Sequence, residues 1–71
     1  MCQGLPCVGH PVELIRTLLV EGVELSSGLV GTVSEEHLLA REVTVYFPAL
    51  GQEFRLAETD LKSGSIQIPG Y

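Results

Sequence analysis

Four side chains of this sequence have the chemistry of metal ligands. Cys2, Cys7 and His10 form a C-x4-C-x2-H arrangement near the N-terminus, and His37 is the other histidine of the chain. Thiolate sulfur and imidazole nitrogen are the ligands of tetrahedral zinc sites. However, the spacing differs from the usual C-x2-C, and there is no second cysteine pair. We therefore predict no metal or other cofactor, and leave open whether the cysteines are free, disulfide-bonded or metal-bound.

A second group of residues could support acid–base chemistry. Glu35, Glu36 and His37 are consecutive, and a histidine between a carboxylate and a serine is the arrangement of a hydrolase triad. The serines that are near in sequence are Ser26, Ser27 and Ser34. The chain has no G-x-S-x-G elbow to expose a nucleophile. We interpret the charged run as a solvated turn and predict that the protein is not an enzyme, with a low-activity hydrolase as the residual alternative.

The charge of the chain limits its partners. The sequence has 71 residues, a formal net charge of -5 and only four cations, which are dispersed. Nucleic-acid backbones and anionic lipids are bound by clustered Lys and Arg, so neither is an expected partner. A basic protein or a cationic ligand fits an acidic surface better. The hydrophobic fraction of 45% is high for so small an interior, which favours self-association as a homo-oligomer.

The elements that would position these residues are mainly strands. Glu42–Phe47 and Gln52–Leu56 alternate apolar and polar residues on both sides of a Pro-Ala-Leu-Gly break, which predicts an antiparallel hairpin. Three further strands are expected near residues 11–15, 29–34 and 65–68. Between them we expect a long folded-back loop at 17–27, a helical turn or connection at 35–41 that carries Leu38 and Leu39 inward, and a helical turn at 57–61.

Five short strands must curl to enclose a core, and closing the sheet removes its unpaired edges. The predicted fold is therefore all-β: a small five-stranded barrel with a long loop after strand 1 and a short helical turn before the last strand. Residues 1–10 are expected to form an irregular N-terminal arm, and residues 11–71 a single domain. Gly31, on the inner face of its strand, predicts a close backbone approach or a bulge.

The order of these motifs resembles the SH3-like small barrels of bacteria. The similarity lies in a V-x-L strand, a long loop, S-G-x-x-G-T-V, V-x-V-x-F and then F-x-L-x-x-x-D-L, which together span about residues 11–62. Similar barrels occur in the variable chain of ferredoxin–thioredoxin reductase and in the β-subunit of nitrile hydratase. Such proteins share no catalytic site and usually act as accessory subunits, so the resemblance implies docking rather than catalysis.

The strand pattern also predicts which apolar side chains face outward. If Val33 and Val45 point inward, then Val30 and Tyr46 point outward, and Ile15 lies opposite Val12 and Leu14. The C-terminal segment could complete its own barrel or add as a strand to a neighbouring subunit. The predicted interface comprises Ile15, Val30, Tyr46, Ile66, Ile68 and Tyr71.

The sequence thus predicts a non-catalytic interaction or accessory module that self-associates and possibly binds another protein. The alternative is a small protein that binds a metal or a cationic ligand. No apolar stretch reaches the length of a membrane span, and the N-terminus lacks the features of a signal peptide. The expected location is therefore the cytoplasm, where thiols normally stay reduced.

Overall fold

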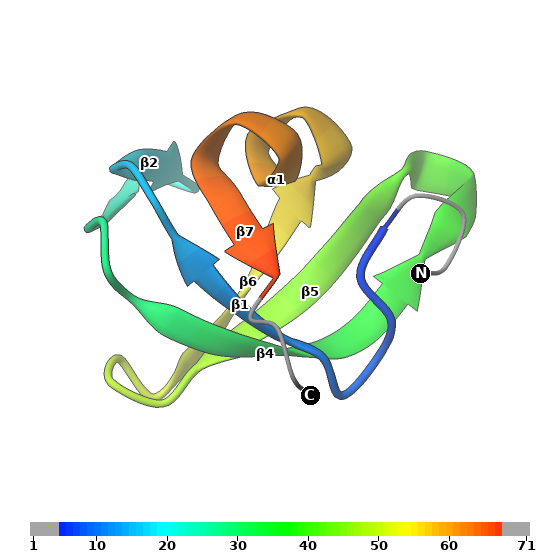
Figure 1. The fold of residues 1–71 in the computed structure, drawn as a ribbon, viewed down its shortest axis with the longest axis horizontal. Helices are drawn as coiled ribbons and strands as arrows, with labels where there is room; N and C mark the ends of the chain where they lie inside the picture. The colour runs from blue at the N-terminus through cyan, green and yellow to red at the C-terminus, as the bar shows by residue number, and fades with distance from the viewer. Residues whose placement is uncertain (1–4, 68–71) are drawn as a thin grey trace.

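The fold is built mainly from β-strands (Figure 1). The computed structural model describes residues 5–67. Its main sheet has five strands in the order β6-β5-β4-β1-β7, and β2 and β3 form a separate hairpin. The elements are β1 (Pro11–Leu14), β2 (Leu18–Val20), β3 (Val23–Leu25), β4 (Val30–His37), the 3-10 helix η1 (Leu38–Ala40), β5 (Glu42–Phe47), β6 (Gln52–Ala57), α1 (Glu58–Gly64) and β7 (Ser65–Gln67). The prediction of a mostly β domain is confirmed.

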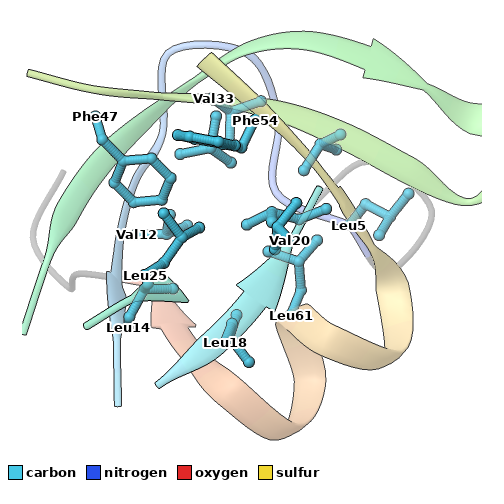
Figure 2. Packing of buried hydrophobic residues seen from close by; sticks show 13 residues of the cluster. Leu5, Val12, Leu14, Leu18, Val20, Leu25, Val33, Phe47, Phe54 and Leu61 are labelled. Atoms are coloured by element: carbon cyan, nitrogen blue, oxygen red, sulfur yellow. The ribbon is translucent and has the colours of Figure 1, made fainter. Parts of the chain in front are cut away.

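The hairpin of β5 and β6 forms the centre of the core, as its alternating pattern predicts. Val43, Val45 and Phe47 on β5 are fully buried, and Phe54 and Leu56 on β6 pack beside them. The ring centroids of Phe47 and Phe54 are 6.2 Å apart and the ring planes are tilted by 52°. Both side chains belong to the buried cluster (Figure 2). This tilted contact adds aromatic attraction to the burial of both rings.

The main sheet curls but does not close, so the predicted closed five-stranded barrel is wrong. Its edge strands β6 and β7 pair only with β5 and β1, respectively, among residues 5–67. The chain between these two edges forms α1, a seven-residue helix that contacts both of them. The two edges are therefore connected through α1 and are not paired with each other. The hairpin of β2 and β3 lies at the same open side (Figure 1).

Residues 17–27, predicted to be a loop, contain the β2–β3 hairpin. Its two-residue turn is made by Glu21 and Gly22, which both have positive φ. A two-residue hairpin turn with positive φ at both positions usually carries Asn-Gly or Asp-Gly, so the Glu-Gly pair is only a weak indication of a hairpin. Within this segment the side chains of Leu18 and Leu25 are buried, whereas that of Leu19 is exposed.

Strand β4 is longer than the sequence pattern indicated and continues to His37. Its pairing with β5 shifts between Val33 and Glu35, which marks a bulge. The chain then turns through η1, where Leu38 packs against the core and Leu39 is fully exposed. The prediction that both leucines point inward is therefore wrong for Leu39. Successive side chains of a 3-10 helix point about 120° apart, so only one of the two can face the core.

The N-terminal arm is anchored in the core. Leu5 is among the fully buried side chains. Farther along the arm, the amide of Gly9 donates to the carbonyl of Val33, and the amide of Val33 donates to the carbonyl of His10. The amide of Val8 donates to Oε2 of Glu36. Residues 5–10 therefore extend the domain rather than trail from it.

Gly31→Ala should destabilise the protein, because β4 passes very close to β5 at this position. A Cβ atom here would lie 2.5 Å from Cγ1 of Val45 and 2.8 Å from the carbonyl oxygen of Tyr46. Overpacking of a core typically costs about 1–3 kcal/mol. Urea unfolding should show a loss of this size, while Thr32→Ala at the exposed neighbouring position should change stability by less than about 0.5 kcal/mol. Equal midpoints for Gly31→Ala and the wild type would contradict the close approach.

Leu5→Ala should cost about 2–4 kcal/mol of unfolding free energy, because it leaves a cavity in the core. The matched control is Val8→Ala, since Val8 is an exposed apolar residue of the same arm. Thermal unfolding followed by circular dichroism would compare the two variants. If both lose equally little stability, the arm is not part of the folded core.

Candidate functional site

The outer face of the five-stranded sheet carries a group of exposed apolar side chains. On β4, Val30 lies opposite Glu13 of β1, and Glu13 lies opposite Ile66 of β7. Two residues farther along β4, Thr32 lies opposite Tyr46 of β5. Directly opposed side chains in a sheet are about 5 Å apart, and diagonal neighbours about 7–8 Å. The register therefore places Val30, Ile66 and Tyr46 in one region of the surface.

We call Ile15, Val30, Tyr46 and Ile66 the outer patch. Their exposed fractions are 51%, 46%, 40% and 48%, respectively. Ile15 joins the patch because it follows Leu14 at the end of β1 and its amide donates to the carbonyl of Gly64, immediately before β7. The outward orientation predicted for Ile15, Val30 and Tyr46 is confirmed, and Ile66 is exposed beside them. Ile68 and Tyr71, the other two residues of the predicted interface, lie outside the described residues.

The other half of the outer face is polar. Glu35 of β4 lies opposite Thr44 of β5, which lies opposite Arg55 of β6. Next to this row, Nε of Arg55 donates to Oε1 of Glu42 in an ion pair. The outer face is therefore divided between an apolar half around the outer patch and a charged half around Glu42.

Two carboxylates interrupt the outer patch, and sequence reasoning did not identify them as part of it. Glu13 lies between Val30 and Ile66, and Glu53 lies opposite Tyr46. Within residues 5–67, neither carboxylate forms a side-chain hydrogen bond or an ion pair. The alternation of the strands contained this signal, because Glu13 occupies the outward position between the inward Val12 and Leu14.

The arrangement around His37 does not form a hydrolase triad. Its Nε2 is 2.9 Å from Oγ1 of Thr44, to which it is hydrogen-bonded. Ser34, the nearest of the three serines in sequence, uses its hydroxyl to donate to the carbonyl of Thr44. Glu36 accepts a hydrogen bond from the arm and lies opposite the buried Val43, on a different face from Glu35. Within residues 5–67, His37 is therefore hydrogen-bonded to neither a serine nor a carboxylate.

The candidate metal ligands that the structure describes, Cys7, His10 and His37, do not form a metal site with each other. Cys7 is disulfide-bonded, which removes the thiolate that a zinc ion requires. Cys2 lies outside the described residues. No group of three or more His, Cys, Asp or Glu side chains within residues 5–67 is arranged to hold a metal ion. His37 instead pairs with Thr44.

An ion pair with two hydrogen bonds joins the end of η1 to α1. Arg41, the αL residue after η1, donates from Nη2 to Oε2 of Glu58 at 2.5 Å and from Nε to Oε1 at 3.3 Å. Nζ of Lys62 lies 3.5 Å from the same carboxylate, one helical turn later. The amide of Glu58 also donates to the carbonyl of Arg41. Hydrogen bonding to Arg41 lowers the pKa of the Glu58 carboxyl.

Comparison of the chain with protein-family models, with curated proteins and with solved structures finds no match. Neither helix within residues 5–67 has the length and hydropathy needed to cross a bilayer.

The contact between Arg41 and Glu58 predicts a pH-dependent contribution to stability. Because the pKa of Glu58 is lower in the folded state than its ordinary value of 4.5, the carboxylate contributes stability above that pH. The contribution is lost as the pH falls through the folded-state pKa. Glu58→Gln should therefore be less stable than the wild type at pH 7, and the difference should shrink in acid.

Denaturant unfolding at a series of pH values would measure this difference. Glu24→Gln is the matched control, because Glu24 lies exposed on β3 and forms no ion pair with the described residues. It should leave the stability at pH 7 nearly unchanged. A deficit of Glu58→Gln that stays constant from pH 7 to strongly acidic conditions would rule out an electrostatic origin.

Proposed function

We propose that this protein is a non-catalytic protein-interaction module of SH3-like architecture, which contacts another polypeptide through the outer patch. The observation that carries the proposal is the gathering of Ile15, Val30, Tyr46 and Ile66 on one sheet face. Scattered apolar side chains are normal on protein surfaces, whereas a contiguous group marks a contact site more often.

The strand order supports an SH3-like arrangement. β1 lies between β4 and β7, the β2–β3 hairpin is inserted between β1 and β4, and a helical turn precedes the last strand. This is the order of motifs that the sequence resemblance implies. An accessory role follows from that resemblance, and a bacterial cytoplasmic location remains part of the proposal. Cys7 is disulfide-bonded, and disulfides persist mainly in oxidising compartments. The cellular location of the protein should therefore be measured directly.

A non-catalytic role is supported by how the polar side chains are used. The side chain of His37 is hydrogen-bonded to Thr44, that of Arg55 to Glu42 and that of Arg41 to Glu58. These contacts join neighbouring strands or join η1 to α1, so they account for the residues in structural terms.

Self-association, which the apolar composition favours, is a second candidate for the same surface. The observation that supports it is the exposure of four large apolar side chains in the outer patch of a single copy. A small domain with so much exposed apolar area gains stability from burying part of it against a second copy.

Tyr46→Glu should abolish the interaction, because it places a charge within the apolar contact. Leu39→Glu is the matched control: it makes the same kind of change at a fully exposed position on η1, outside the outer patch. Multi-angle light scattering would report self-association. Affinity capture from the native host, followed by mass spectrometry, would report other partners.

The proposal predicts a complex that forms with the wild type and with Leu39→Glu but is lost with Tyr46→Glu. A protein that is monomeric in all three forms, and that captures the same proteins with Tyr46→Glu as with the wild type, would refute it. Turnover of an ester or phosphate substrate that disappears on His37→Ala would refute the non-catalytic part.

A further inference from the structure

The charges of the outer face distinguish between possible occupants of the outer patch. The outward positions of the main sheet carry four carboxylates, Glu13, Glu35, Glu42 and Glu53, and one guanidinium, Arg55. Four negative charges against one positive charge give this face a formal net charge of −3. Arg55 is already paired with Glu42, so no cation on the face is available to Glu13 or Glu53.

The remaining cations of the chain are engaged elsewhere. Arg41 and Lys62 both contact Glu58. Arg16 follows Ile15, but its Nη1 donates to the carbonyl of Ser63 at 3.5 Å, near the end of α1. A second copy that presents the same face would therefore bring carboxylates toward carboxylates, and the Arg55 of that face is already paired with Glu42.

Burying Glu13 in such a contact would be costly. It lies between two residues of the outer patch, so any surface that covers both Val30 and Ile66 also covers Glu13. Removing an unpaired carboxylate from water costs several kcal/mol, and like charges across an interface add to that cost. A partner that supplies a cation at this point instead gains a charge-assisted hydrogen bond.

We propose that the outer patch binds an apolar segment of a different protein that carries basic residues on both sides, and not a second copy of this chain. This inference rests on the proposed function and specifies the chemistry of the partner. Val30 and Tyr46 contact the apolar side chains of the segment, while Glu13 and Glu53 each pair with one Lys or Arg.

The positions of the two carboxylates set the spacing of those basic residues. Glu13 is on β1 and Glu53 is on β6, and β4 and β5 lie between these strands. Three strand spacings of about 4.8 Å across the sheet, together with an offset of two residues or roughly 7 Å along β4, correspond to roughly 16 Å between the two positions. An extended peptide covers this distance in about four to five residues, so the segment has two basic residues about four to five positions apart with apolar residues between them.

The probe is a synthetic peptide of about nine residues, in which two basic residues at this spacing flank apolar residues. A second peptide has glutamates in place of the two basic residues. Fluorescence anisotropy would measure binding to the full-length protein. The basic peptide should bind saturably and more weakly as salt is raised, since screening acts on exposed charge pairs. The acidic peptide should not bind.

Paired variants separate local recognition from overall charge. Glu13→Gln with Glu53→Gln should weaken binding of the basic peptide by about three- to tenfold, the range expected for losing two partly exposed ion pairs. Glu21→Gln with Glu24→Gln removes the same total charge from the β2–β3 hairpin and should leave the affinity unchanged. Equal weakening by both pairs, or no binding of the basic peptide, would overturn the inference.

The inference and the proposed function can fail separately. A wild-type dimer that dissociates on Tyr46→Glu, together with no binding of the basic peptide, would refute the inference and leave the outer patch as an interface between copies. A monomer that binds neither peptide, and whose captured proteins are unaffected by Tyr46→Glu, would refute both. Saturable binding that is lost with Tyr46→Glu and weakened only by the Glu13 and Glu53 pair would support both.

Discussion

The close approach of β4 to β5 at Gly31 is the constraint on which the rest of the structure depends. Because this position has no Cβ, the ring of Phe47 and the side chain of Val45 pack directly against the backbone of β4. That contact allows the sheet to curl around one small core. With the sheet curled, the seven residues of α1 are enough to connect its two edge strands, β6 and β7. A bulkier residue at Gly31 would separate the strands and open the core that these elements cover.

The same curl determines what faces the solvent. The inner face of the sheet contributes the fully buried side chains of β1, β4, β5 and β6, so every alternate residue must point outward. Some of these outward residues are apolar, and they lie on neighbouring strands rather than being dispersed. The carboxylates of Glu13 and Glu53 lie among them. The surface therefore combines apolar area with negative charge, which suits a partner of opposite charge better than an identical copy.

Much of the fold could be predicted from local patterns, and the failures have specific causes. The β5–β6 hairpin alternates cleanly, so its inward residues were predicted correctly. The β2–β3 hairpin was missed because Glu21 and Gly22 are not a common turn pair. Leu39 was expected to point inward because it is a leucine, but only one face of η1 contacts the core. Leu5 gave no periodic signal, since a single buried residue in an irregular arm has no pattern around it.

The sequence by itself determined the five strands of the main sheet, the inward and outward alternation within them and the exposure of Ile15, Val30 and Tyr46. These features follow from the two-residue period of a strand, which any stretch of sequence displays locally. Only the tertiary structure decided that the sheet stays open, that Cys7 and His37 do not share a site, and that Glu13 lies between Val30 and Ile66. These features depend on which strands are neighbours and in what register, and such long-range pairings leave no mark on the local sequence pattern.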